Sequence, residues 1–83
     1  MTLKQFIKKN KPGLEDKFKE MNNYVELARN NIDYLYNFNR ANECFQYIDG
    51  YIWALYMYNI ITKEEHNELF NELIEARNIK PKE

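Results

Sequence analysis

Apolar residues recur at intervals of four and three along most of the chain, the spacing that places side chains on one face of an α-helix. The longest such series begins at Leu14, and its intervening positions are mostly Lys, Glu, Asn and Arg. Its members are Leu14, Phe18, Met21, Val25, Ala28, Ile32 and Leu35. This series predicts a long amphipathic helix over residues 14–37.

A second series has the same spacing but differs in phase from the first by one residue. Its members are Ala41, Phe45, Ile48, Ile52 and Leu55. The change of phase predicts a turn near "NFNR" at 37–40, with an asparagine as the cap or left-handed residue, and a helix over 41–60. One unbroken helix over 14–60 would be roughly 70 Å long, which suits an extended dimer, and this alternative stays open.

Two shorter helices are predicted from their start signals. Thr2 with Gln5, and Thr62 with Glu65, have the spacing of a capping box, which predicts helices over 3–10 and 63–78. The buried stripe expected for the last helix is Leu69, Phe70, Leu73, Ile74 and Ala76. The predicted fold is a single all-α domain over residues 1–83, a small bundle of three to four helices, either monomeric or dimeric.

The stretch "YIDGYIWALYMYNII", residues 47–61, has almost no polar face. The core series already uses three of its residues, and four others lie on different faces of the helix. These four are Tyr51, Trp53, Met57 and Tyr58. Because aromatic residues and Met are enriched at interfaces, we predict that the four contribute to a protein–protein surface. The competing hypothesis is that the other helices bury all four within one chain.

The net charge and its distribution along the chain bear on whether nucleic acid is an expected partner. The 83 residues carry a net charge of −1, so no bulk attraction to nucleic acid is expected. The first twenty residues nevertheless hold six lysines against three acidic residues. The candidate phosphate contacts are Lys4, Lys8, Lys9 and Lys11. The alternative is that these lysines form an ordinary solvated helix face.

Signals for catalysis, metals and membranes are weak. The chain has no serine, and no spacing typical of metal ligands surrounds its one histidine, His66, which we expect to be solvent-exposed. The lone Cys44 is expected to be a small buried thiol in a reducing compartment. We predict no catalytic residue, no cofactor, no metal and no membrane association, and a cytoplasmic location.

Residues 49–73, "DGYIWALYMYNIITKEEHNELFNEL", resemble the apolar-helix and "IT-x-EE" ending of small helical proteins from phages and mobile elements. The stretch is also similar to the SHOCT oligomerisation module, "G-I-I-T-x-E-E", with Asn59 in place of its glycine and His66 in place of an aromatic residue. The bias toward Asn, Ile, Lys and Tyr is typical of low-GC Gram-positive bacteria. The resemblance implies a protein that works by contact, as anti-CRISPR proteins do.

The function predicted is a non-enzymatic protein-binding module that inhibits or regulates a host complex, such as a CRISPR or other defence nuclease. One alternative is a nucleic-acid-binding regulator that uses the basic N-terminal segment. Another is a structural protein that forms a homodimer.

Overall fold

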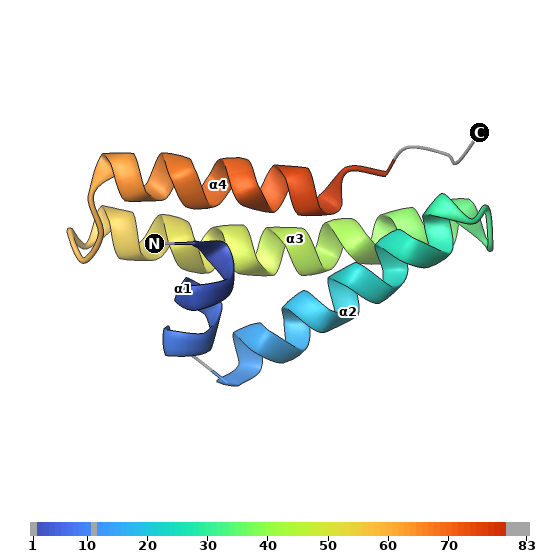
Figure 1. Ribbon diagram of the computed structural model, residues 1–83, viewed down its shortest axis with the longest axis horizontal. Coiled ribbons are helices and arrows are strands. Elements are labelled where there is room, and N and C mark those ends of the chain that lie inside the picture. The colour runs from blue at the N-terminus through green and yellow to red at the C-terminus, as the bar shows by residue number, and fades with distance from the viewer. Residues whose placement is uncertain (1, 11, 80–83) are drawn as a thin grey trace.

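The computed structural model describes residues 2–10 and 12–79, which form four α-helices and no strand. Helix α1 covers Leu3–Asn10, α2 covers Pro12–Arg29, α3 covers Tyr34–Met57 and α4 covers Lys63–Arg77 (Figure 1). The predicted all-α class is confirmed for this part of the chain. The single long helix over 14–60 is excluded, because a turn separates α2 from α3.

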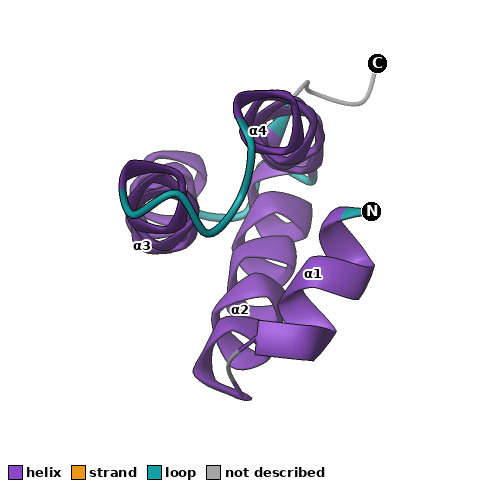
Figure 2. Ribbon diagram, turned by 90° about the vertical axis from the view of Figure 1, so that its left-hand side faces the viewer, coloured by secondary structure: helices purple, strands orange, loops and turns teal. Residues whose placement is uncertain are grey.

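Helix α3 has neighbouring helices on two sides. It packs against both α2 and α4, and the chain reverses direction at each connection (Figure 1). Seen end-on, α2, α3 and α4 form a triangle, with α1 lying beside α2 (Figure 2). Helix α1 contacts both α2 and α4, and the molecule measures 40 × 23 × 18 Å. A helix that packs against two others needs apolar residues on more than one face, and this accounts for part of the apolar character of α3.

The interior consists of the apolar faces that the sequence predicts. All four helices and the α3–α4 turn contribute side chains that are buried: Leu3, Phe6 and Ile7; Leu14, Met21 and Val25; Ala41, Cys44, Phe45, Ile48 and Ile52; Ile61; Leu69 and Leu73. Phe18 and Leu55 are partly buried against this core. The two series are therefore confirmed from Leu14 to Ala28 and from Ala41 to Leu55.

The predicted turn at 37–40 is wrong: α2 ends eight residues before position 37, and the turn to α3 lies at 30–33. Asn37, interpreted from sequence as a turn residue, lies inside α3 and is only 4% exposed. Its position continues the buried face of α3 by one turn beyond Ala41. Because a polar residue occupies a position on the buried face, the apolar series was interrupted there, and the interruption was interpreted as a turn.

Two left-handed residues make the α2–α3 turn. Asn31 has a φ of 57°, and Asp33 has a φ of 41°. The backbone amides of Asn31 and Ile32 donate to the carbonyls of Ala28 and Leu27, both at 3.0 Å. This pair of bonds is the Schellman motif, which ends a helix when the following residue adopts positive φ.

The same motif ends α3, which therefore stops at Met57 and not at the predicted residue 60. Asn59 has a φ of 60°, its amide donates to the Tyr56 carbonyl at 3.0 Å, and the Ile60 amide donates to the Leu55 carbonyl at 2.9 Å. Asparagine tolerates this conformation better than other residues that have a Cβ atom.

Both predicted capping boxes are present. Gln5 and Thr2 exchange bonds at 3.1 and 3.2 Å, and Thr62 and Glu65 do so at 3.0 and 3.1 Å. These reciprocal bonds satisfy amides that have no carbonyl partner in the first turn of a helix. They explain why the starts of α1 and α4 were predicted correctly.

Three residues expected on buried faces lie outside the core. Ile32 is 50% exposed, Leu35 is 71% exposed and Ile74 is 41% exposed. The first two leave the α2 series because α2 has already ended before them. Ile74 lies at the edge of the α4 stripe, where Phe70 and Ala76 are half-buried.

Candidate interaction surface

The strongest candidate surface lies at the α3–α4 end of the bundle. Four large apolar side chains are exposed there: Trp53 (51%), Met57 (58%), Tyr58 (78%) and Ile60 (66%). We call these four residues the apolar end. Trp53 and Met57 share one face of α3, because four residues correspond to about 40° of net rotation. Tyr58 and Ile60 follow in the turn. Three of the four residues predicted for a protein–protein surface, Trp53, Met57 and Tyr58, are therefore exposed.

A cluster of rings holds Trp53 in place. Its ring centroid lies 5.6 Å from that of Tyr56 and 5.5 Å from that of His66. The Tyr56 and His66 rings are 5.1 Å apart, and His66 also contacts Phe70 at 6.1 Å. A side chain held by such contacts loses less conformational freedom when a partner covers it. The Trp53 ring is therefore held by contacts within the chain although about half of it is exposed.

His66 differs from its sequence expectation. It was expected on the open surface, but it is half-buried and its ring contacts three aromatic rings. The reason is the tight α3–α4 turn, which brings the first turn of α4 alongside the last two turns of α3. Among the described residues, no group of three His, Cys, Asp or Glu side chains could hold a metal ion.

Tyr51 does not belong with the other three residues that were predicted with it. It is half-buried, and its ring centroid lies 6.3 Å from that of Phe6 on α1. Two residues along a helix correspond to about 200° of rotation, so Tyr51 and Trp53 point to opposite sides of α3. The structure thus brings together Trp53, Met57 and Tyr58, and places Tyr51 under α1.

Ile60 was missed at the sequence level, although a signal was present. The residue after a left-handed helix terminator is often apolar, because it packs back toward the last turn of the helix. Asn59 followed by Ile60 has this arrangement, as does Asn31 followed by Ile32. Each isoleucine is nevertheless at least half exposed, so both ends of the bundle present an apolar side chain to solvent.

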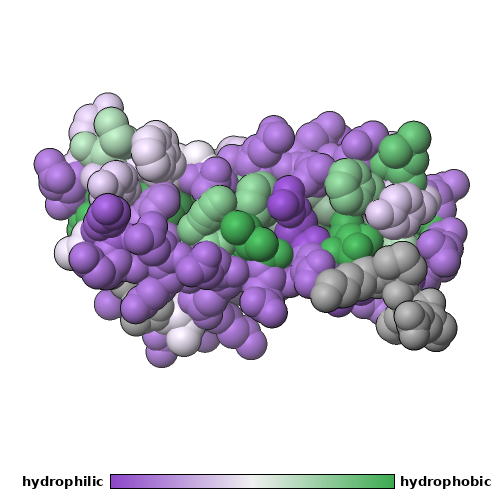
Figure 3. Space-filling view, turned by 90° about the horizontal axis from the view of Figure 1, so that it is seen from above, coloured by the Kyte–Doolittle hydropathy of each residue, from purple (hydrophilic) through white to green (hydrophobic). Residues whose placement is uncertain are grey.

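A second exposed apolar region lies at the opposite, α2–α3 end. It contains Leu35 and Tyr36, which are 71% and 61% exposed, and Tyr34, which stacks on Phe38 with a centroid distance of 5.9 Å. On the face seen from above, apolar side chains gather in the middle and toward this end (Figure 3).

The basic residues predicted as phosphate contacts lie mostly on α1. Lys4, Lys8 and Lys9 are exposed, and Lys11 lies outside the described residues. Lys4 and Lys8 line one cavity together with Lys19 of α2 and with Glu15. Lys9 is not part of that lining. The structure therefore brings Lys4 and Lys8 together with Lys19, and it places the Glu15 carboxylate among them.

Cys44 is buried and free, as expected. Burial raises the pKa of its thiol, and the Glu20 carboxylate, whose Oε2 lies 3.8 Å from Sγ, raises it further. A thiol that resists ionisation is a poor nucleophile. Cys44 lies in the core cluster, where α3 packs against α2.

Comparisons of the chain with protein-family models, with curated proteins and with solved structures found no significant match. Within the part of the chain that the structure describes, no helix combines the length and the apolar character that crossing a bilayer requires.

Proposed function

We propose that this chain is a non-enzymatic protein-binding module whose contact surface is the apolar end. The observation that carries the proposal is the exposure of the apolar end. Each of its four residues is more than half exposed, although the core residues next to them are buried. Trp and Tyr are the residues most enriched among those that dominate binding energy at interfaces. Large apolar side chains that gather on an exposed surface are typical of interaction sites.

The proposed partner class rests on the resemblance of residues 49–73 to phage and mobile-element proteins. A helical bundle about 40 Å long can block a surface on a larger complex without catalysing a reaction. We propose a larger host or phage complex as the target, with a CRISPR or other defence nuclease as the leading candidate.

A comparative capture experiment tests this proposal. The wild-type chain, a Trp53→Ala/Tyr58→Ala variant and a Tyr36→Ala control are each immobilised and exposed to host lysate. Tyr36 is an exposed aromatic residue at the opposite end of α3, at 61%. We expect at least one protein to be retained by the wild type and the control but to be depleted about tenfold or more on the double variant. Equal recovery of every protein on all three chains would contradict the proposal.

A second copy of the chain is the other protein partner predicted from sequence. Light scattering of the wild type and of Trp53→Ala separates this alternative from a foreign target. A concentration-dependent dimer that Trp53→Ala dissociates would identify the apolar end as a self-association surface. If the wild type is monomeric, the apolar end remains available to a foreign partner.

A further inference from the structure

A groove with opposite charges at its two ends crosses the side of the bundle where α1 packs. One part is a cavity of about 580 Å³ between α1, α2 and α4, with Glu72 and Glu75 on the α4 side. The other is a cavity of about 240 Å³ between α1 and α2. The two share Lys4, Phe18 and Asn22 in their linings, so together they form one continuous groove.

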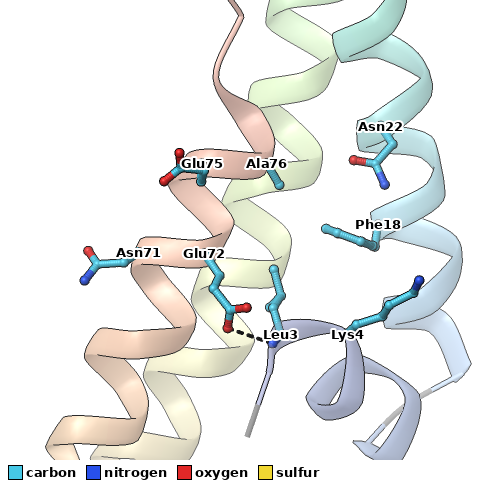
Figure 4. Close-up of a pocket in the computed structure, with 8 residues that line it drawn as sticks. All are labelled: Leu3, Lys4, Phe18, Asn22, Asn71, Glu72, Glu75 and Ala76. Atoms are coloured by element: carbon cyan, nitrogen blue, oxygen red, sulfur yellow. Dashed lines mark hydrogen bonds between the residues drawn. The ribbon is translucent and has the colours of Figure 1, made fainter.

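The middle of the groove has an apolar floor, flanked by the polar side chains of Lys4 and Asn22. The ring of Phe18 extends from α2 toward α4, and Leu3 and Ala76 lie opposite it (Figure 4). Phe18 is half-buried, so part of its ring remains accessible, whereas Leu3 is only 4% exposed. An apolar side chain of moderate size fits above this floor.

The α1–α2 end of the groove is basic. Lys4, Lys8 and Lys19 line it, against the single carboxylate of Glu15. Glu15 lies 4.0 Å from the Lys19 ammonium, and both side chains are more than half exposed. Such a pair is weak, so Lys19 remains able to bind another carboxylate.

The α4 end of the groove is acidic. Glu72 Oε2 accepts a hydrogen bond of 2.8 Å from the backbone amide of Leu3, and its other oxygen keeps acceptor capacity. Glu75, one turn further along α4, lies at the outer rim (Figure 4). The Leu3–Glu72 bond also attaches α1 to α4, so the wall of the groove is fixed before any ligand arrives.

We infer that this groove binds a peptide segment in which one apolar residue separates an acidic residue from a basic residue. The acidic residue lies between Lys8 and Lys19, the apolar residue lies over Phe18, and the basic residue lies at Glu75. The larger cavity, of about 580 Å³, is in the range of ligand sites, roughly 300–1,000 Å³, and the smaller one extends it toward α2. Nucleic acid is disfavoured, because Glu15, Glu72 and Glu75 would repel a phosphate chain. The site does not depend on the apolar end.

The test uses four fluorescent pentapeptides, with blocked ends, and the full-length chain at low salt. The mixed peptide is Asp-Asp-Leu-Lys-Lys; the others are all-acidic, all-basic, or mixed with Gly in place of Leu. We expect the wild type to bind the mixed peptide about fivefold or more tightly than each of the others, as judged by fluorescence polarisation. A fifteen-residue thymidine oligonucleotide is included as a competitor.

Charge-reversed variants make the test specific. Lys8→Glu with Lys19→Glu should transfer the preference to the all-basic peptide, and Glu75→Lys should transfer it to the all-acidic peptide. Lys9→Glu is the control, because it reverses one charge on α1 outside the groove, and it should leave the order of affinities unchanged. Misfolding cannot produce two opposite changes of preference.

Three results would overturn the inference. One is that the charge-reversed variants bind the four peptides in the same order of affinity as the wild type does. Another is an effect of Lys9→Glu equal to that of the groove variants, which would indicate net charge alone. The third is an oligonucleotide that binds more tightly than any peptide. Trp53→Ala should leave peptide binding unchanged, so failure of the groove and failure of the apolar end are separate outcomes.

Discussion

The side-chain amide of Asn37 donates a hydrogen bond of 2.6 Å to the backbone carbonyl of Ile32. Asn37 is 4% exposed and lies on the buried face of α3, whereas Ile32 belongs to the turn that precedes this helix. The bond satisfies a buried polar group and fixes the direction in which the chain leaves α2. One residue of the core thus positions the turn.

Replacing Asn37 by leucine tests this role. The Ile32 carbonyl would lose its donor, and we expect the free energy of unfolding to fall by about 1–3 kcal/mol. Asn39→Leu is the matched control, because Asn39 is exposed on the same helix. Urea denaturation of the two variants and the wild type measures the difference. Equal stability of both variants would show that the turn does not require the Asn37 amide.

Asn59 is expected to be the residue that ends α3, because its φ of 60° is unfavourable for side chains with a Cβ atom. Asn59→Ala should lower the free energy of unfolding by about 1 kcal/mol, whereas Asn59→Gly should be neutral or slightly stabilising. Thermal unfolding monitored by circular dichroism measures both. Asn23→Ala, an exposed position within α2, is the control. A glycine variant less stable than the alanine variant would contradict the left-handed geometry.

The capping box of α4 predicts a dependence of stability on pH. The Glu65 carboxylate accepts the Thr62 backbone amide at 3.0 Å, and this bond lowers its pKa below the ordinary value of about 4.5. A group whose pKa is lower in the folded state adds stability above its ordinary pKa and loses it as the pH falls through the folded value. Glu65→Gln keeps a neutral acceptor at this position.

The difference in unfolding free energy between the wild type and Glu65→Gln should therefore shrink as the pH is lowered from about 7 to about 3. Urea midpoints at the two pH values measure it. Glu68→Gln removes the same charge from the same helix outside the capping box and serves as the control. A difference that grows at low pH would have the wrong sign for this mechanism.

Much of the fold could be predicted from the sequence because its signals are local. A capping box depends on two side chains three residues apart, so the starts of α1 and α4 were found correctly. The turn between α2 and α3 depends on which asparagine adopts positive φ and which one is buried. Asn31 and Asn37 are chemically identical in the sequence, and only tertiary packing tells them apart.

Only part of the candidate surface could be predicted, because local spacing can be read from the sequence and tertiary packing cannot. Helical rotation alone separates Trp53 and Met57 from the core series, so their exposure was expected. Tyr51 was placed with them because the position of α1 over that face cannot be read from local spacing. The groove of Lys8, Phe18 and Glu75 combines three helices, so no sequence window contains it.

Urea unfolding of Trp53→Ala tests most directly whether Trp53 serves contact or folding. The apolar-end account predicts a loss of no more than about 1.5 kcal/mol, the scale of the ring contacts with Tyr56 and His66. Ile48→Ala, at a fully buried position of the same helix, should by comparison lose about 2–5 kcal/mol. A loss of about 3–5 kcal/mol for Trp53→Ala, matching that of the core variant, would show that Trp53 is a core residue and would contradict the account.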